Sequence, residues 1–172
     1  VATGEALTPP MVERYRKLVP EGTIVSSYGL TETQGETSVA TYSPSRAVND
    51  MVSIGSPHSV YSYGIRSLET SEWLTAAGAQ GELYIAGPLI LDGYYKRADG
   101  VCLADDAANA RFSLAAPEVW PLSRGSPARM YQTGDLVMRR TDGEVQHLGR
   151  CDDQVKVNGV RIELGHVSSL LP

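Results

Sequence analysis

Cysteine, histidine and phenylalanine are scarce in this sequence of 172 residues, which contains two, three and one of them. Cys102 and Cys151 do not have the close spacing of metal ligands, and two cysteines are too few for a disulfide framework. This scarcity argues against a secreted scaffold stapled by disulfides. We therefore expect a protein of a reducing compartment, the cytoplasm.

Long apolar runs and an excess of positive charge are missing too. No stretch approaches the ~20 apolar residues that a transmembrane helix needs, and the first residues lack the pattern of a signal peptide. The formal net charge is −5 and the basic residues are dispersed, so we expect neither a membrane nor a nucleic-acid partner. With 42% hydrophobic and 20% charged residues, the composition is that of a soluble globular chain of about one domain.

The first thirty residues predict a helix followed by a strand. The Thr-Pro-Pro sequence of residues 8–10 is typical of a helix start, with a hydroxyl side chain as the cap and proline where its missing N–H is not needed. Apolar residues recur at helical spacing up to Val19, and Pro20 and Gly22 end the helix. Residues 23–28 have a short β pattern, and a helix that leads into a strand indicates an α/β layer.

The middle of the chain has the pattern of short strands joined by turns. Residues 81–87 form a predicted strand between glycines, with Leu83 and Ile85 on one face. A hairpin is predicted over residues 136–148, around the turn dipeptide Asp142-Gly143. The other expectations are strands over 37–42 and 60–68, a turn over 54–57, a loop with a helical turn over 69–80, and a short helix over 104–112 within the turn-rich segment 98–126.

A candidate nucleotide-binding loop follows the first strand, in Tyr28-Gly29-Leu30-Thr31-Glu32. Ligands of α/β proteins usually lie at the carboxyl ends of strands. The tyrosine offers a ring for stacking on a base, and the glycine lets backbone approach closely. The threonine hydroxyl can donate to a phosphate oxygen, and the glutamate is a hard oxygen ligand of the kind that Mg²⁺ prefers. On the residues alone, a structural loop with a packed tyrosine is the simpler explanation.

Thr133-Gly134-Asp135 is the second candidate. An isolated Thr-Gly-Asp is typical of a tight turn. A carboxylate at this position can instead accept hydrogen bonds from both hydroxyls of a ribose. Both interpretations are open on the residues alone.

The segment that begins at Arg150 combines a cluster of charges with a hairpin. Arg150, Asp152 and Asp153 bring opposite charges together at positions that look exposed, and such a junction can serve as a pivot. The dipeptide Asn158-Gly159 then separates two β-patterned runs, which is the strongest short-range signal for a type I′ hairpin.

The run GRCDDQVKVNGVRIELG in this segment closely resembles the hinge and first hairpin of the small C-terminal domain of adenylate-forming enzymes. These are the acyl-CoA synthetases, the luciferases and the adenylation domains of nonribosomal peptide synthetases, and the wording is most similar to the peptide-synthetase branch. Tyr-Gly-Leu-Thr-Glu, Tyr-Gln-Thr-Gly-Asp-Leu and the Gly-Glu-Ala of residues 4–6 resemble further motifs of the family. Leu30 is the form more common in CoA ligases.

The resemblance implies roles for individual residues. It places Tyr28 on adenine, Thr31 near the α-phosphate and Glu32 on Mg²⁺, so Thr31 and Glu32 are the candidate catalytic residues. It also places the ribose hydroxyls on Asp135 and Arg150. The ATP and AMP contacts implied in this way are Gly4, Glu5, Tyr28, Gly29, Thr31, Asp135 and Arg150.

A substrate pocket and a hinge are implied by the same resemblance. The side chain of the acyl or amino acid would lie near Val1, Thr3, Ser27, Gly35 and Glu36. Glu36, if it faces the pocket, implies a substrate with a basic or polar side chain, although a single glutamate is more usually exposed to solvent. Asp152 would be the hinge, and Gly159 would lie in the hairpin that relatives turn toward the active site during thioester formation.

The expected fold is α/β with a large β component. Residues 1–151 would be the C-terminal part of the large adenylation domain, with an α/β layer and a barrel-like β subdomain, and residues 152–172 the hinge and start of the small domain. The implied function is that of an ATP- and Mg²⁺-dependent, AMP-forming ligase that activates a carboxylate, by resemblance an amino acid, and transfers it to the phosphopantetheine thiol of a carrier protein. A fragment of an acyl- or aryl-CoA ligase and a degenerate, non-catalytic interaction module are the alternatives.

The chain opens and stops abruptly, and the phosphate loop and the C-terminal lysine of the family do not occur within it. We therefore expect a fragment that cannot adenylate a substrate by itself.

Overall fold

A computed structural model describes residues 1–4, 7–46, 48, 52–98, 101–121, 128–152, 154–157 and 160–163. Its elements in chain order are α1 (Pro9–Leu18), β1 (Ile24–Leu30), the 3₁₀ turn η1 (Thr31–Thr33), β2 (Gly35–Tyr42), β3 (Ser53–Pro57), β4 (Ser62–Arg66), β5 (Trp73–Leu74), β6 (Gln80–Gly87), β7 (Tyr95–Ala98), β8 (Val101–Ala104), α2 (Asp106–Asn109), β9 (Phe112–Leu114), β10 (Arg129–Arg139), β11 (Val145–Arg150), β12 (Gln154–Val157) and β13 (Val160–Glu163).

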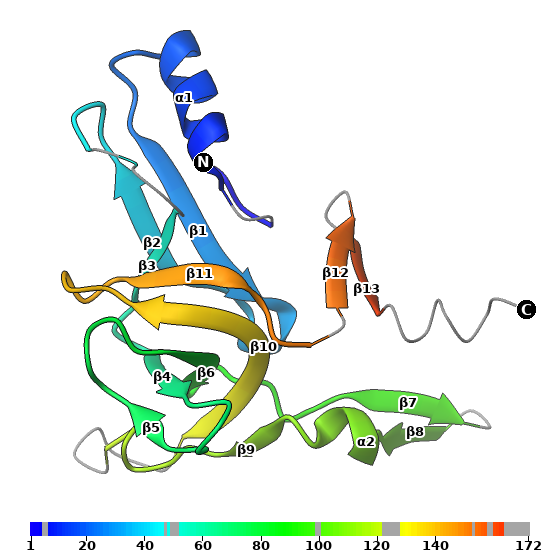
Figure 1. The fold of residues 1–172 in the computed structure, drawn as a ribbon. Coiled ribbons are helices and arrows are strands. Elements are labelled where there is room, and N and C mark those ends of the chain that lie inside the picture. The colour runs from blue at the N-terminus through cyan, green and yellow to red at the C-terminus, as the bar shows by residue number, and fades with distance from the viewer. Residues whose placement is uncertain are drawn as a thin grey trace, which may run out of the picture.

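The molecule is a sheet-rich α/β structure built on a nine-stranded sheet. The strands run in the order β1-β2-β3-β11-β10-β6-β4-β5, and β9 pairs with β10. Figure 1 shows that the long β1–β2 ribbon leaves the curved part of the sheet at one side, with α1 beside it, while the β7–β8 hairpin and α2 project at another. The expected combination of a helix–strand opening with a β-rich middle is therefore confirmed.

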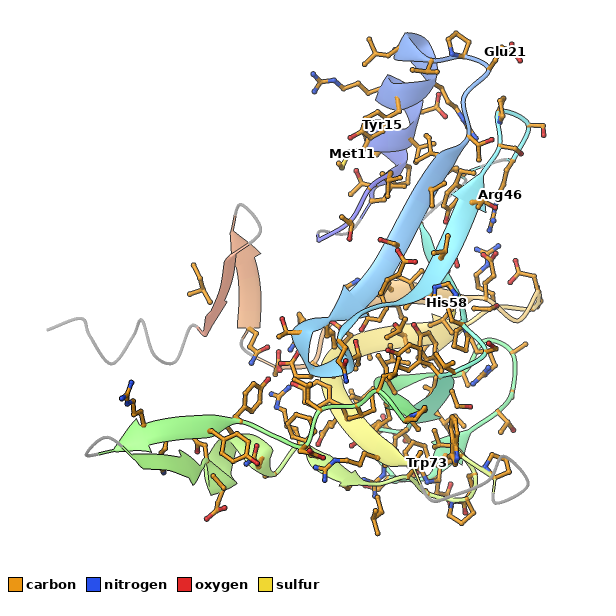
Figure 2. All side chains as sticks on the ribbon, turned by 180° about the vertical axis from the view of Figure 1, so that it is seen from behind. Met11, Tyr15, Glu21, Arg46, His58 and Trp73 are labelled. Carbon is orange, nitrogen blue, oxygen red and sulfur yellow. The ribbon has the colours of Figure 1, made fainter. Side chains whose placement is uncertain are left out.

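Helix α1 has the predicted bounds but not the predicted cap. The Thr8 side chain makes no capping hydrogen bond, while the Thr8 carbonyl accepts the first helical hydrogen bond, from the Val12 amide at 3.1 Å. Val12 is fully buried in a small core with Leu7, Ala40, Tyr42 and Val52. The other apolar residues of the helical pattern, among them Met11 and Tyr15, remain partly exposed (Figure 2).

Strand β1 is longer than predicted and continues through most of the candidate loop. It pairs antiparallel with β2 from Ile24 opposite Tyr42 to Leu30 opposite Gly35. On its other edge, Ala2 forms a parallel bridge to Ser26. The N-terminal segment is thereby attached to β1 by backbone hydrogen bonds.

Strand β6 confirms the predicted alternation and carries a core on each of its faces. Leu83 and Ile85 are completely buried in the largest apolar cluster, together with Tyr131 of β10. Tyr84 and Ala86 point to the opposite face, into a second cluster. Because side chains of a strand alternate between faces, a strand covered on both sides is buried along its length.

Three expectations for the middle of the chain are wrong in detail. Residues 53–57 form strand β3 and not a turn, because Gly55, at a φ of +83°, lets the strand pass so close to Val39 that a Cβ would lie 2.2 Å from the Val39 carbonyl oxygen. Trp73 and Leu74 form the short strand β5 where a helical turn was expected. The helix expected over 104–112 is only the single turn α2.

Both predicted hairpins are present. Strands β10 and β11 flank Asp142-Gly143 and pair antiparallel. Strands β12 and β13 pair with Val157 opposite Val160, as a two-residue connection requires. Asn158 and Gly159 lie outside the described residues, as do residues 164–172. Neither described helix has the length and apolar character needed to cross a membrane.

Candidate functional site

The segment 133–135 is a bulge in the middle of β10, so the tight-turn interpretation is wrong. Strand β10 pairs with β6 on both sides of the segment, and the register shifts between Gln132 and Leu136. Gly134 adopts a φ of +76°, which favours glycine. Bulges bend a strand and re-aim its side chains, and they are frequent next to active sites.

Glu82 of β6 holds this bulge from below. Its buried carboxylate accepts a hydrogen bond from the Gly134 amide at 3.0 Å and one from the Gln132 side-chain amide at 2.8 Å. The Thr133 hydroxyl donates to the Leu83 carbonyl at 2.8 Å. Gln132 thus helps to fix the bulge to β6. Sequence reasoning missed the part played by Glu82.

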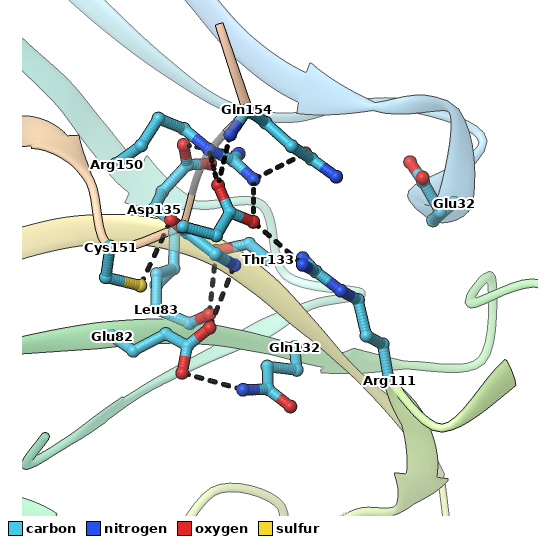
Figure 3. Close-up of polar contacts among 12 residues, drawn as sticks. Glu32, Glu82, Leu83, Arg111, Gln132, Thr133, Asp135, Arg150, Cys151 and Gln154 are labelled. Carbon is cyan, nitrogen blue, oxygen red and sulfur yellow. Dashed lines mark hydrogen bonds and ion pairs between the residues drawn. The ribbon is translucent and has the colours of Figure 1, made fainter. Parts of the chain in front are cut away.

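Two of the predicted nucleotide-binding residues, Tyr28 and Arg150, contact a third, Asp135, and Figure 3 shows Arg150 beside Asp135. The Tyr28 hydroxyl donates to Asp135 Oδ2 at 2.5 Å, and Arg150 Nη1 donates to Asp135 Oδ1 at 2.9 Å. The hairpin register places Asp135 directly opposite Arg150 on β11. Tyr28 is 107 residues away from Asp135 in the sequence, and only the order of strands in the sheet brings them together.

His147 is a further partner of this carboxylate that sequence reasoning missed. His147 Nε2 lies at hydrogen-bonding distance, 3.1 Å, from Asp135 Oδ1. Burial alone would raise the pKa of Asp135, but the contacts with His147, Tyr28 and Arg150 outweigh it and hold that pKa below its ordinary value. The pKa of Tyr28 is well above its ordinary value, through burial and then the charge of Asp135. The predicted hairpin around residues 142–143 already implied that residue 147 lies near residue 135.

Asp152, the predicted hinge, is held by two arginines. Arg150 Nε donates to Oδ1 at 2.8 Å, and Arg150 Nη2 and Arg111 Nη2 donate to Oδ2 at 2.6 and 2.8 Å. Although burial opposes it, these cations lower the pKa of Asp152 to about 2. The junction was expected to be exposed, yet the Arg150 and Asp152 side chains are only 19% and 20% exposed. That expectation is wrong because Arg111 and the β10 bulge cover the junction.

Glu32, the predicted magnesium ligand, lies in η1 and is almost completely buried, at 2% exposure. It accepts a hydrogen bond from the Tyr131 hydroxyl at 3.1 Å and another from the Tyr94 hydroxyl. The fully buried Thr33 fixes the turn, because its hydroxyl donates to the Leu30 carbonyl at 2.9 Å. In Figure 3, Glu32 lies apart from the cluster around Asp135. Sequence reasoning missed Thr33, Tyr94 and Tyr131.

A single buried carboxylate is compatible with Mg²⁺ when a substrate supplies the remaining oxygens. Proteins commonly bind Mg²⁺ through one or two carboxylates together with substrate phosphates and waters. In the described parts of the chain, no group of three or more His, Cys, Asp or Glu residues could hold a metal. Glu32 therefore fits a metal brought by a phosphate-bearing ligand and not a dedicated protein cage.

The glycine of the candidate loop has a clear structural reason. A Cβ on Gly29 would lie 1.9 Å from the Gly35 carbonyl oxygen, where β1 and β2 change register. Thr31 is exposed at the start of η1, with its side chain available to solvent. Gly4 has a φ of +86°, and Glu5 lies outside the described residues.

The five predicted pocket residues lie along β1, the start of β2 and the N-terminal segment. Their exposure differs: Ser27 is half-buried and the other four are exposed. Glu36 Oε1 is 3.2 Å from Nε2 of His58, and both side chains are about half exposed. His58 directly follows β3, and its amide donates to the Thr37 carbonyl of β2 at 2.9 Å (Figure 2). The described structure thus gives Glu36 a partner on the protein and leaves its role toward a substrate as a prediction.

Comparison with known proteins gives one family. Residues 1–95 match the family described as AMP-binding enzyme. The isonitrile lipopeptide synthase of Mycobacterium tuberculosis (strain ATCC 25618 / H37Rv) is 40% identical over 173 residues, which cover 99% of this chain and 6% of that protein. The nonribosomal peptide synthetase ecdA of Aspergillus rugulosus is 36% identical over 166 residues, covering 96% of this chain and 2% of that protein.

A solved structure shares the fold. PA1221, an NRPS protein containing adenylation and PCP domains, aligns with a TM-score of 0.77 and 24% identity over 96% of this chain and 31% of that chain. The chain therefore spans a small part of the length of the proteins that it resembles.

Proposed function

Because the chain belongs to the AMP-binding enzyme family, we propose that it is part of an enzyme that activates a carboxylate as acyl-AMP and transfers the acyl group to a thiol. In the first step a carboxylate oxygen attacks the α-phosphorus of ATP and pyrophosphate leaves. In the second step a thiolate sulfur attacks the acyl carbon and AMP leaves. We take the substrate to be an amino acid and the thiol to be carrier phosphopantetheine, since the similar proteins include peptide synthetases and one with adenylation and PCP domains.

The observation that carries this proposal is the convergence of Tyr28 and Arg150 on the Asp135 carboxylate. A group that binds both hydroxyls of a ribose needs a charged acceptor in a fixed orientation, and the bulge of β10 provides one. A ring that stacks on the attached base has to lie beside that acceptor, where Tyr28 lies. These are the roles that the resemblance implies, and the contacts are consistent with them.

Glu32 would hold Mg²⁺ in the complete enzyme, and the metal would supply positive charge against the phosphates. The chain's own part is to fix the carboxylate. The hydroxyls of Tyr94 and Tyr131 orient it, and burial keeps competing water away. Asp152 would be the pivot about which the small domain turns between the two steps, with the domain boundary after residue 151.

The test is carboxylate-dependent ATP–pyrophosphate exchange by the complete protein that carries this chain, with amino acids and with acyl and aryl acids. Exchange with one amino acid, followed by a mass increase of the carrier domain, supports the proposal. Thioester formation on free CoA instead would favour the CoA ligase. No exchange with any carboxylate would favour the non-catalytic module.

Asp135→Asn and Asp142→Asn form a matched pair for the same assay. Asp135 is 4% exposed in the site, whereas the Asp142 side chain is 44% exposed at a hairpin tip and pairs with Arg140. We expect the first change to raise the KM for ATP about tenfold or more, by loss of hydrogen bonds to a charged group. The second should leave the KM unchanged. Equal effects of the two changes would contradict the site.

A further inference from the structure

Arg111 links the predicted hinge to a distant element of the large domain. It follows α2 and precedes β9, and its guanidinium donates to Asp152 Oδ2 at 2.8 Å. Its backbone carbonyl accepts a hydrogen bond from the Gln132 amide of β10 at 2.9 Å, so Arg111 is itself fixed to the central sheet. The Arg111 side chain is 30% exposed, and the ion pair is therefore partly shielded from solvent.

The contact with Arg111 differs in kind from the contacts with Arg150. Arg150 is two residues from Asp152 in the chain, and its guanidinium is also fixed to Asp135 of β10. Arg111 is 41 residues away. A change in φ at Asp152 withdraws the carboxylate from Arg111, because the side chain then turns with the part of the chain that follows.

The ion pair of Arg111 and Asp152 packs against the backbone of Gly134. A Cβ at this glycine would lie 2.3 Å from Asp152 Oδ2 and 2.9 Å from Arg111 Nη1, so the cluster rests directly on the bulge. Cys151 is exposed but is tied to the same place: its amide donates to the Gly134 carbonyl at 2.9 Å and its thiol contacts that carbonyl at 3.2 Å. The hinge segment is therefore docked on the bulge, and Arg111 closes one side of it.

We propose that Arg111 is a positioning residue that latches the hinge in the orientation seen here, and that its release from Asp152 accompanies rotation of the small domain. This inference rests on the proposed role of Asp152 as the pivot. Loss of Arg111 removes a contact that would break on rotation and spares the pair of Arg150 with Asp152. The latch therefore sets the balance between the two orientations without touching a substrate.

Cys151 provides a native reporter of the latch. In the complete protein we compare the rate at which iodoacetamide alkylates Cys151 in wild type, Arg111→Gln and Arg111→Lys, using mass spectrometry of peptides. Because a hydrogen bond between charged groups stabilises by a factor of about ten or more, we expect about tenfold faster alkylation of Cys151 in Arg111→Gln. Lysine keeps the charge without the planar fork and should give an intermediate rate.

Arg140→Gln is the matched control, because Arg140 also pairs with an aspartate, Asp142 at 3.0 Å, but at the far tip of the hairpin. It should leave the Cys151 rate unchanged. A Cys151 rate in Arg111→Gln equal to that of wild type overturns the proposal. If Arg111→Gln loses the circular dichroism spectrum of the folded protein, Asp152→Asn decides: an unchanged Cys151 rate in that variant overturns the latch.

A second measurement tests the link to catalysis. We expect Arg111→Gln to change the ratio of the adenylation rate to the thioester-forming rate by about threefold or more. The reason is that rotation at the hinge partly limits the two steps, and the variant changes the hinge equilibrium about tenfold. A faster Cys151 with an unchanged ratio overturns the latch as a determinant of the two steps. If wild type adenylates no carboxylate, the proposed function fails, while the alkylation comparison still decides whether Arg111 holds the hinge.

Discussion

Glu32 and Asp135 are both almost completely buried acids, at 2% and 4% exposure, yet their surroundings differ. Two tyrosine hydroxyls donate to Glu32. Asp135 also accepts from a tyrosine, but in addition it meets the guanidinium of Arg150 and the ring of His147. Tyrosine hydroxyls orient the first acid, whereas a guanidinium and an imidazole contact the second in addition to a tyrosine.

This difference separates two uses of a buried carboxylate. The hydroxyls of Tyr94 and Tyr131 orient the Glu32 carboxylate, and an oriented carboxylate oxygen is a ligand that suits a hard metal ion. An arginine partner compensates the charge of Asp135 and leaves it as a positioned hydrogen-bond acceptor. The comparison therefore favours metal binding at Glu32 and hydroxyl recognition at Asp135, which are the roles that we propose.

The sharpest way to break the comparison is Glu32→Gln in the complete protein. The amide keeps the shape but loses the charge, so we expect ATP–pyrophosphate exchange to fall about 100-fold or more, the size typical of removing one charge-stabilising group. Glu21→Gln, at an exposed turn after α1 (Figure 2), is the control and should change nothing. Exchange within threefold of wild type would remove Glu32 from the metal site.

Gly134→Ala tests whether the arrangement of charged groups around Asp135 depends on close packing against the bulge of β10. A Cβ there meets Asp152 and Arg150 at 2.3 and 2.5 Å. Gly143→Ala imposes a similar positive φ, +85°, with nothing within 4 Å, and so costs only the backbone strain of ~1–2 kcal/mol. We expect Gly134→Ala to raise the KM for ATP and the alkylation rate of Cys151 as well, and Gly143→Ala to do neither. Identical behaviour of the two variants would mean that the collision is relieved without moving the cluster.

Tyr131→Phe tests whether a tyrosine hydroxyl orients the Glu32 carboxylate for metal binding. It removes one hydroxyl that orients the carboxylate, and we expect the Mg²⁺ concentration for half-maximal exchange to rise about tenfold. Tyr63→Phe is the control, because its buried hydroxyl contacts Thr37 and not Glu32. Thermal stabilisation by Mg²⁺ and ATP gives a second readout that does not need turnover. Unchanged Mg²⁺ dependence in Tyr131→Phe would show that the hydroxyl does not orient the acid.

The smallest effect concerns pH. The pKa of Asp152 is about 2 in the folded chain, below the ~3.9 of an unfolded aspartate. A lowered pKa stabilises the folded state above about pH 4, and this contribution is lost as the pH falls toward 2. We expect Asp152→Asn to melt ~2–4 °C below wild type at pH 6, with a smaller gap at pH 3. A gap that does not shrink on acidification would contradict the charge-based account of the hinge.

Local sequence patterns predicted the elements that depend on residues close to each other in the chain. Alternation along residues 81–87 predicted β6, and the dipeptide Asp142-Gly143 predicted the β10–β11 hairpin. The turn expected over 54–57 failed because a glycine that normally ends a strand here permits one strand to cross close to another. The Thr8 hydroxyl makes no cap, and Pro10, at one of the two positions whose N–H such a cap uses, has no N–H to donate.

Most of the candidate site could be predicted only from the amino-acid sequences of its motifs. The identities of Tyr28, Glu32, Asp135 and Arg150 were in the sequence, because each residue type suits one part of a nucleotide. The residues that support them, such as Tyr94 and Tyr131, could not be predicted, because no motif in the sequence around them indicates a role in the site. Such partners are chosen by the pairing of strands that are far apart along the chain.

The sequence by itself determined the family, the short strands and the chemistry of the residues that face the site, because these depend on residue types and on local spacing. Only the tertiary structure decided that Glu82 fastens the bulge, that Arg111 reaches the hinge and that the charged junction is covered. The reason is physical: burial and long-range ion pairs arise when β10 is placed between β6 and β11, and no local pattern encodes that order of strands.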